Sequence, residues 1–475
     1  MTGCASWQKK VELILTRLGG YNMGVDYLEL LPSSFKNWLK GRKVEEVECI
    51  LSDLAGVSRG KAMPSSKFSR QEKMFMPLSI FYQTISGDYV DMKIRDQWTE
   101  NDMVLVPDYS TAVCLPWSAD VTVQVIHDAQ DLAGKPIDLV PRNVLKKVVN
   151  LFKEKGWSPL VAPEIEFYLT KPNLDPNLPI EPTMGRTGRR VASRQAYSMS
   201  AVEEYGKVID DIYDFAEAQG FEIDTINQEG GAGQIEINLV HGDPLKLADQ
   251  VFFFKRLIRE AALRQDCFAT FMAKPIQDEP GSAMHIHQSI LDLKTGKNIF
   301  ANDNGQPTEY FYNFVGGQQK FLPNVISLVA PYVNSYRRYM ASGSAPINLE
   351  WGRDNRTTGI RVPLSRPDSL RIENRVVGMD CNPYLAIAAS LATGYLGIKE
   401  RIQPREEVKG EAYSLPRALP RGLLEALDLF DESPNLEKIL GRNFCQVYKS
   451  VKRYEAESYL QVISPWEREH LLLNV

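Results

Sequence analysis

Ionisable side chains recur at alternate positions in four short apolar segments of this chain. They are Glu164 and Glu166 in segment 161–169, Glu236 in segment 234–239 with Glu229 just upstream, His285, His287 and Ser289 in segment 283–289, and Arg371, Glu373 and Arg375 in segment 370–375. The two-residue period of a β-strand predicts that such side chains share one face of a sheet. The apolar residues between them would then face a core.

If these strands share a pocket, the glutamates crowd together, and desolvating uncompensated ions is unfavourable. Hard divalent cations would remove that difficulty. Five glutamates and one histidine suit two Mg²⁺ or Mn²⁺ ions, which favour oxygen ligands and tolerate imidazole. For any one segment, a half-buried strand with its polar side in water remains the structural alternative, as does a structural role for His285. The recurrence across four segments favours the metal site.

A second group of residues is cationic and falls within fewer than 40 positions. Its members are Arg337, Arg338, Arg353, Arg356, Arg361, Arg371 and Arg375. Guanidinium groups bind carboxylates and phosphates in a bidentate manner, although a surface ion-pair network would account for one or two of these residues. Metals with arginines, and no serine or cysteine nucleophile motif, indicate phosphoryl transfer. Segment 56–62 lacks the spacing of a P-loop, so ATP would be held in another way.

The elements that must position these residues divide the chain. At 475 residues it exceeds what one hydrophobic core usually supports. Strands are expected over 44–51, 103–107 and 121–127, and a helix over 144–155. Helix-spaced aliphatics at 7–18 and 27–40 precede them. We therefore expect a helical extension at 1–40, a small sheet-rich domain at 41–138 and a larger catalytic domain at 139–475.

The bulk properties exclude other classes of protein. The net charge of −5 gives no general basic field for binding nucleic acid. No run approaches the about 18 apolar residues of a membrane span, and the first residues lack the features of a secretion signal. The six cysteines are far apart, which argues against structural zinc and a disulfide scaffold. A cytoplasmic location and no membrane partner are the resulting expectations.

In type and order, the segments resemble the motifs of the glutamine synthetase superfamily from about Val44 to the C-terminus. The motifs lie at 53–61, 163–167, 229–236, 274–289, 334–338, 355–363 and 371–375. The resemblance implies an α+β fold, in which an N-terminal β-grasp domain precedes a catalytic domain with a curved antiparallel sheet flanked by helices. It also implies a homododecamer of two stacked hexameric rings, in which a neighbour's first domain completes each site.

The resemblance assigns roles to individual residues. It implies one metal ion held by Glu166, Glu229 and Glu236, and a second held by Glu164, His285 and Glu373. Gly281, Arg338 and Arg375 would hold L-glutamate, while Arg356 and Arg361 would stabilise the transferred phosphate. His287, Ser289 and Arg371, together with Arg361, would contact ATP. The implied reaction forms a γ-glutamyl phosphate from which an amine displaces phosphate, with Arg338, Arg356, Arg361 and Arg375 as the catalytic arginines.

The chain departs from ammonia-using members at three positions, two of them in the ammonium pocket. Ser344 stands where those members have a glutamate, and Ser86 where they have an aspartate that contacts ammonium. Losing both carboxylates weakens selection of a small cation, since a unit-charge pair contributes roughly 1 to 4 kcal/mol in a partly exposed site. The pattern is similar to γ-glutamylpolyamine and γ-glutamylputrescine synthetases, which use an organic amine. Asp88 or Asp91 is a candidate for the missing base, and Pro280 replaces an asparagine.

Two other interpretations stay open. An ordinary glutamine synthetase using ammonia would need an acidic group from elsewhere in the pocket. A non-catalytic ring protein of the same fold would have no evident reason to keep all six presumed metal ligands. Tyr413 lies near a position that is adenylylated in some bacterial glutamine synthetases, although a plain surface loop is the preferred interpretation there.

Overall fold

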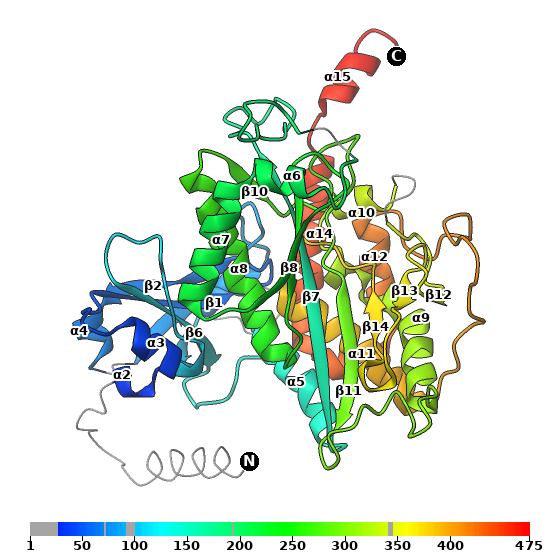
Figure 1. Ribbon diagram of the computed structural model, residues 1–475, viewed down its shortest axis with the longest axis horizontal. Coiled ribbons are helices and arrows are strands. Elements are labelled where there is room, and N and C mark those ends of the chain that lie inside the picture. Colours follow the sequence, from blue (N-terminus) through cyan, green and yellow to red (C-terminus); the bar gives the residue numbers. More distant parts are fainter. Residues whose placement is uncertain (1–26, 71–72, 92–99, 192–193, 341–344) are drawn as a thin grey trace.

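The computed structural model describes residues 27–70, 73–91, 100–191, 194–340 and 345–475. Two β-sheets organise these residues, one from the first part of the chain and one from the remainder (Figure 1). The helix predicted over 7–18 and the candidate residue Ser344 lie outside the described ranges. Within those ranges, no helix is both long enough and apolar enough to cross a bilayer.

The first sheet has six strands in the order β2-β1-β6-β4-β3, with β5 paired to β6. They are β1 (Glu46–Ser52), β2 (Ser58–Pro64), β3 (Met74–Pro77), β4 (Asp102–Pro107), β5 (Val113–Cys114) and β6 (Thr122–Gln130). Strands β1 and β6 are parallel and the other pairs are antiparallel. The strands predicted over 44–51, 103–107 and 121–127 are therefore confirmed.

Two short helices cover part of the first sheet. They are α2 (Tyr27–Leu30) and α3 (Ser33–Trp38), so the helical region predicted over 27–40 is interrupted. Pro32 stands between them and its missing N–H prevents a continuous helix. Tyr27 and Phe35 are buried against Val47 and Cys49 of β1. The helices thus share a hydrophobic cluster with the sheet.

The second sheet has eight strands in the order β12-β13-β14-β11-β7-β9-β8, with β10 paired to β7. They are β7 (Trp157–Thr170), β8 (Ile223–Gln228), β9 (Gln234–Leu239), β10 (Phe268–Thr270), β11 (Ile286–Asp292), β12 (Trp351–Arg353), β13 (Ile360–Val362) and β14 (Ile372–Asn374). All neighbours are antiparallel except β12 and β13. The long strand β7 is central, which leaves it flanked by β9 and β11.

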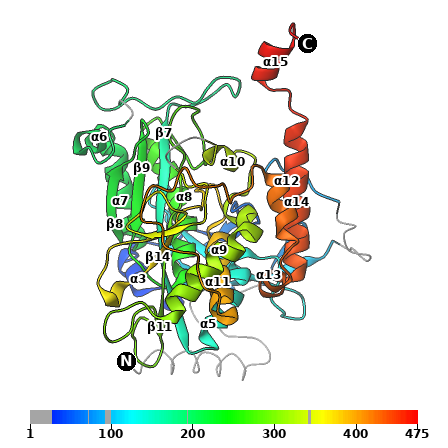
Figure 2. The same ribbon diagram turned by 90° about the vertical axis from the view of Figure 1, so that its right-hand side faces the viewer.

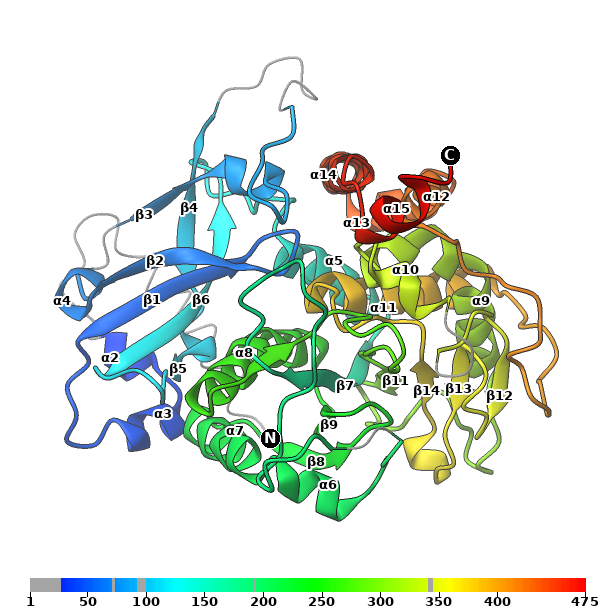
Figure 3. The same cartoon turned by 90° about the horizontal axis from the view of Figure 1, so that it is seen from above.

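Helices pack against one face of the second sheet and against one another. Helices α5 (Pro141–Lys153), α8 (Pro244–Arg264) and α11 (Pro383–Glu400) contact β7 or β11, and α11 also packs against α9 (Glu309–Val329). Helix α8 begins where the Asp243 carboxylate accepts the N–H groups of Leu245 and Lys246, with Pro244 in the first turn. Figure 3 shows α5 and α8 between the two sheets.

The remaining helices surround this core. They are α4 (Ser65–Phe68), α6 (Met199–Glu204), α7 (Gly206–Gln219), α10 (Ser335–Arg338), α12 (Leu423–Phe430), α13 (Pro434–Leu440), α14 (Arg442–Leu460) and α15 (Pro465–Leu471), with short 3-10 turns at Leu78–Tyr82, Tyr109–Thr111 and Pro367–Ser369. Helix α15 buries none of its residues, and Figure 2 shows it standing clear of the body at the C-terminal end.

Arg142, in the first turn of α5, ties the two sheets together. Its guanidinium contacts Asp249 of α8 at 2.9 Å, Asp128 of β6 at 2.8 Å and Asp108 beyond β4 at 2.8 Å. The Arg142 side chain is only 4% exposed. A buried charge with this many partners is well compensated, whereas removing one side of such a network is strongly destabilising. The first sheet is therefore anchored to the helices of the second.

Candidate active site

Strand β7 supplies the first two carboxylates of the candidate site. Ile165 and Phe167 are fully buried, whereas Glu164 and Glu166 alternate with them and face the opposite side of the sheet. Glu166 lies directly opposite Glu236 of β9 in the antiparallel register. The alternation predicted for segments 161–169 and 234–239 is therefore confirmed.

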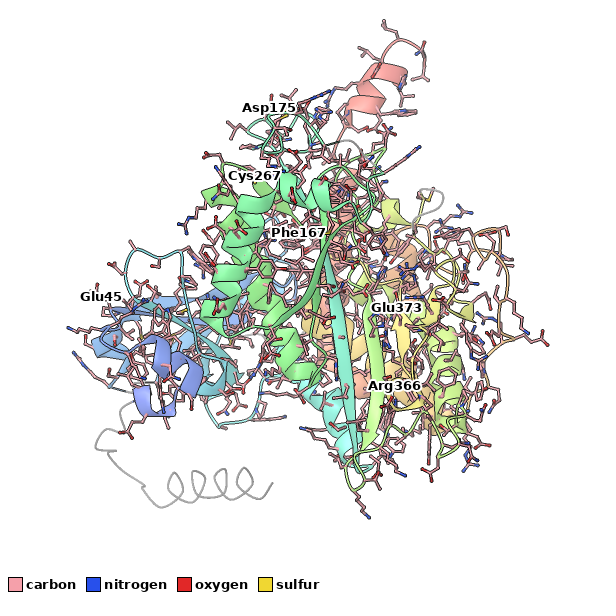
Figure 4. The ribbon with its side chains drawn as sticks, in the orientation of Figure 1. Glu45, Phe167, Asp175, Cys267, Arg366 and Glu373 are labelled. Atoms are coloured by element: carbon pink, nitrogen blue, oxygen red, sulfur yellow. The ribbon has the colours of Figure 1, made fainter. Side chains whose placement is uncertain are left out.

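Strands β11 and β14 bring the next group from later in the chain. His287 of β11 lies opposite Glu373 of β14. Glu373 is two strands along the sheet from Phe167 of β7, and both residues are labelled in Figure 4. Strand β11 begins at Ile286, later in the chain than the predicted segment, and β14 is shorter than predicted because it spans only Ile372–Asn374. His285 precedes β11, yet its Nδ1 is 2.8 Å from Glu164 Oε2.

Five of the six predicted metal ligands converge. Ligand atoms of Glu164, His285 and Glu373 lie within 4.8 Å of one another, as do those of Glu166, Glu236 and His285. His285 belongs to both groups, whereas sequence comparison assigned it to one. These oxygen donors and one imidazole fit Mg²⁺ or Mn²⁺. The assignment of each ligand to an ion remains a prediction.

Glu229, the sixth predicted ligand, lies beside these two groups. Its Oε1 accepts a hydrogen bond from Asn227 Nδ2 at 3.1 Å. Its charge also raises the pKa values of Glu166 and Glu236, after the larger effect of burial. We call Glu166, Glu229 and Glu236 the anionic half of the site.

The anionic half carries carboxylates that resist ionisation. Burial, followed by repulsion from Glu229 and Glu236, holds the pKa of Glu166 well above its ordinary value. Burial and then Glu164 raise the pKa of Glu236 to about 8. Burial likewise raises the pKa of Glu229. A bound cation replaces protons on such ligands, so metal affinity should increase with pH.

The paired half of the site is Glu164, His285 and Glu373. Burial raises the pKa of Glu164, but hydrogen bonds from His285 and His287 outweigh it, so the net pKa is well below the ordinary value. For Glu373, Arg375 and the histidines outweigh burial and lower the pKa to about 2. Burial, with Arg375, lowers the pKa of His285 to about 4, so its imidazole is neutral and able to bind a metal.

The arginines predicted from the sequence separate into two sets. Arg361 donates to Glu373 Oε2 at 2.7 Å, and Arg375 pairs with the other oxygen of the same carboxylate. Arg371 Nε is 3.3 Å from His287 Nδ1. Arg353 instead pairs with Glu407 on the surface, as the ion-pair alternative predicted.

Three other predicted arginines have different surroundings. Arg338 is buried and donates to the carbonyl oxygens of Arg375 and Val376 at 2.9 and 3.1 Å. Arg337 donates to the Tyr459 hydroxyl at 2.7 Å. Arg356 is exposed, and its charge lowers the pKa of Glu229, although burial has the larger, opposite effect. Arg356 therefore lies on the solvent side of the anionic half.

A cavity of about 540 Å³ adjoins the paired half. Glu164 lines it, together with three of the four residues predicted to contact ATP, namely His287, Ser289 and Arg371; the fourth, Arg361, does not line it. Its volume is within the range of small-molecule sites, which is roughly 300 to 1,000 Å³. Asp224 and His241 also line the cavity. Sequence analysis missed both, because neither belongs to a repeated polar pattern.

The candidate amine residue Ser86 lies in a loop of the first sheet. Its hydroxyl donates to Asp88 Oδ2 at 2.9 Å and also contacts Thr84. The neighbouring Ile85 N–H donates to Glu455 of α14 at 2.7 Å. Within the described part of one chain, these contacts do not join Ser86 to the carboxylates. With Ser344 outside the described ranges, the amine pocket remains a prediction.

Comparison with known proteins identifies the class. Residues 138–471 match the model of the glutamine synthetase catalytic domain. The chain belongs to the glutamine synthetase family, whose members use ATP and divalent metal ions, and the second sheet with its helices is a catalytic domain of this type. The family predicted from the sequence motifs is therefore confirmed.

Individual relatives and a solved structure are similar to this chain over most of its length. The chain is 33% identical to γ-glutamylputrescine synthetase PuuA of Escherichia coli (strain K12) over 455 residues, which covers 94% of each chain. It is 32% identical to glutamate–isopropylamine ligase of a Pseudomonas species over 444 residues, covering 91% of this chain and 96% of the relative. The solved structure of a GmaS/ADP complex superposes with a TM-score of 0.79 at 27% identity, over 92% of this chain and 99% of that chain.

Proposed function

We propose that this protein uses ATP to join the γ-carboxylate of L-glutamate to an organic amine. The observation that carries the proposal is the convergence of five predicted metal ligands beside a cavity lined by His287, Ser289 and Arg371. The relatives named for putrescine and isopropylamine support an amine larger than ammonia. Glutamine synthetases are nearly as similar, at 30% identity for that of Thermus thermophilus. Sequence identity alone therefore does not establish which amine is the substrate.

The first step transfers a phosphoryl group. A γ-carboxylate oxygen of glutamate attacks the γ-phosphorus of ATP, and ADP leaves with the electrons of the broken P–O bond. Bound Mg²⁺ or Mn²⁺ would neutralise the phosphate charge that opposes this attack. Gly281, Arg338 and Arg375 are proposed to hold glutamate, and Arg356 and Arg361 to stabilise the transferred phosphate.

The second step forms the amide. The lone pair of a neutral amine attacks the carbonyl carbon of γ-glutamyl phosphate, the C–O bond to phosphate breaks, and inorganic phosphate leaves. The amine nitrogen gives up a proton, for which Asp88 or Asp91 of a neighbouring subunit is a candidate acceptor. Serine at positions 86 and 344 removes two carboxylates that would favour ammonium, and leaves room for a carbon chain.

The assembly and domain limits are part of the same proposal. We propose a helical extension at 1–40, a β-grasp domain at 41–138 and the catalytic domain at 139–475, which the family match beginning at residue 138 supports. Two stacked hexameric rings would let the Ser86 loop of one subunit complete its neighbour's site. The contacts of this loop with α14 on its own chain are compatible with that arrangement.

A phosphate-release screen tests the proposal. With ATP, glutamate and Mg²⁺ or Mn²⁺, the amines should include ammonium, diamines, polyamines, monoalkylamines, ethanolamine and anilines. We expect an organic amine to give the highest kcat/KM, and Ser344→Glu to shift preference toward ammonium. Ammonium as the best acceptor, unchanged by Ser344→Glu, would favour an ordinary glutamine synthetase. No ADP release with any amine, from protein that binds ATP and metal, would favour a non-catalytic ring protein.

A further inference from the structure

Two loops of the site are held together by hydrogen bonds to each other and to strand β7 that no sequence motif predicts. One loop, 229–233, connects β8 to β9 and carries Glu229. The other, 274–282, precedes β11 and carries Gly281. The Tyr168 hydroxyl donates to Pro280 O at 2.8 Å, and Ala232 N–H donates to Glu279 Oε2 at 3.3 Å. The loop with a predicted metal ligand and the loop with a predicted glutamate contact are therefore held against each other.

The side chain of Gln234 lies where these loops meet β7. Gln234 is the first residue of β9 and is 1% exposed. Its Nε2 donates to Gly281 O at 3.0 Å and lies 3.4 Å from Glu166 Oε2. Its Oε1 accepts the N–H of Gly231 at 3.0 Å. A primary amide has two donor hydrogens and an acceptor oxygen, so one side chain serves all three groups.

The backbone of Gln234 closes the same loop. Its N–H donates to Gly231 O at 3.1 Å, and its carbonyl accepts the N–H of Glu229 at 2.8 Å. Glu166 Oε2 also accepts the N–H of Ala283 at 2.7 Å, which leaves Oε1 nearer His285. A shift of the Glu166 carboxylate would therefore move the amide that holds Gly281, and a shift of Gly281 would move Glu166.

We infer that Gln234 is a positioning residue that couples metal binding at Glu166 to L-glutamate binding at Gly281. This inference rests on the proposed function for the identity of the two ligands. Binding either ligand fixes the amide, so the second ligand finds its site already ordered. Such coupling is reciprocal: glutamate must tighten metal binding by the same factor by which the metal tightens glutamate binding.

The contacts explain why this position requires glutamine. A glutamate here would present an acceptor to two other acceptors, Gly281 O and Glu166 Oε2. A methionine keeps the volume but offers no donor. The neighbouring Gly231 is also constrained, because an added Cβ would lie 1.9 Å from the Tyr168 hydroxyl. The packing leaves no space for a bulkier residue between the loops.

The test measures coupling directly by calorimetry on the full-length protein. The Mn²⁺ dissociation constant is measured with and without saturating L-glutamate, in wild type, Gln234→Met and Gln234→Glu. We expect glutamate to tighten Mn²⁺ binding in wild type, and this ratio to fall toward one in both variants. Loss of the hydrogen bonds that the Gln234 amide makes should weaken glutamate binding about tenfold, with a smaller change in kcat.

Two further variants separate coupling from general stability. Gln318→Met removes another fully buried amide, whose Nε2 is 3.2 Å from Ser390 Oγ in the helical core. It should lower the melting temperature and leave the coupling ratio unchanged. Tyr168→Phe removes only the hydrogen bond to Pro280 and should reduce the ratio about threefold. It provides the measurement if the Gln234 variants do not fold, as judged by circular dichroism.

The outcomes distinguish this inference from the proposed function. The role of Gln234 is overturned if the wild-type protein has a coupling ratio of one. It is also overturned if Gln234→Met keeps the ratio of the wild type. Both conclusions hold even in an active ligase. If the Gln234 variants do not fold, a wild-type ratio in Tyr168→Phe overturns it instead. Conversely, coupling that is lost in Gln234→Met, in a protein that ligates no amine, supports the role of Gln234 and overturns the proposed activity.

Discussion

The two halves of the carboxylate site differ in how the charge of their buried carboxylates is compensated. In the paired half, Glu373 contacts Arg361 and Arg375, and the pKa of this carboxyl is lowered to about 2. In the anionic half, burial followed by repulsion from Glu164 and Glu229 raises the pKa of Glu236 to about 8, and among the described residues no arginine forms an ion pair with it. The protein thus neutralises one half with its own cations and leaves the other dependent on a bound ion. Removing a charge should therefore have opposite effects on stability in the two halves.

The largest effect is expected in the paired half. Glu373→Gln leaves Arg361 and Arg375 buried without their shared carboxylate, so the free energy of unfolding should fall by about 3–5 kcal/mol. Urea denaturation with EDTA at neutral pH measures it. Because the folded pKa of Glu373 is lowered, this contribution is present above the ordinary value of 4.5 and is lost as pH falls toward 2.

A matched variant controls for Arg361. Asp354 is the other carboxylate in contact with Arg361, and its side chain is 47% exposed. Asp354→Asn should change the free energy of unfolding by less than about 1 kcal/mol. Equal losses for Asp354→Asn and Glu373→Gln would contradict the distinction between the two halves.

Metal addition should stabilise the protein through the anionic half. A free Mn²⁺ concentration about 100 times the dissociation constant should raise the free energy of unfolding by about 2.7 kcal/mol per site. The shift in melting temperature on adding Mn²⁺ to EDTA-treated protein measures this effect. No shift at any Mn²⁺ concentration, in protein that remains folded, would contradict a metal site.

Glu236→Gln should make the metal-free protein more stable. The folded pKa of Glu236 is raised to about 8, so stability present below 4.5 is lost as pH rises toward 8. Substitution should restore roughly 1–3 kcal/mol near pH 8 and flatten this pH dependence. The same variant should lose the Mn²⁺-induced shift. Exposed Glu222 provides the control, because Glu222→Gln should leave both measurements unchanged. A destabilised Glu236→Gln would contradict the assignment of charge excess to this half.

The smallest effect is expected outside both halves. Arg353 pairs with Glu407 at the surface, where its side chain is 44% exposed. Arg353→Ala should change the free energy of unfolding by about 0–1 kcal/mol and leave kcat/KM unaltered. Steady-state kinetics with the best amine substrate checks this expectation. A large loss of activity would mean that Arg353 belongs with the site arginines.

Much of the site could be predicted because strand periodicity is local. Alternation alone correctly predicted that Ile165 and Phe167 face the core, whereas Glu164 and Glu166 face the other side of the sheet. Which strands lie side by side is a long-range property, so the sharing of His285 between two ligand groups was not predictable from spacing. The family resemblance supplied the order of motifs, and with it the expectation that they converge.

Other features depend on tertiary contacts that leave no pattern in the sequence. His241 and Asp224 line the cavity only because the start of β8 and the end of β9 lie near the part of β7 that pairs with β11 on its other side. The role of Gln234 follows from where its amide meets Gly281, a residue 47 positions away. Pro32 could have predicted that segment 27–40 forms two helices. The helical spacing of its aliphatic residues favoured one continuous helix instead.

The Arg142 network has a consequence for how subunits would assemble. Its guanidinium joins the strand ends of the first sheet to the helix beneath the second, so each subunit should behave as one rigid wedge. If subunits meet first sheet to catalytic site, the opening angle of that wedge decides how many close a circle. The Arg142 network would then be one of the contacts within a subunit on which the rotational symmetry of the particle depends.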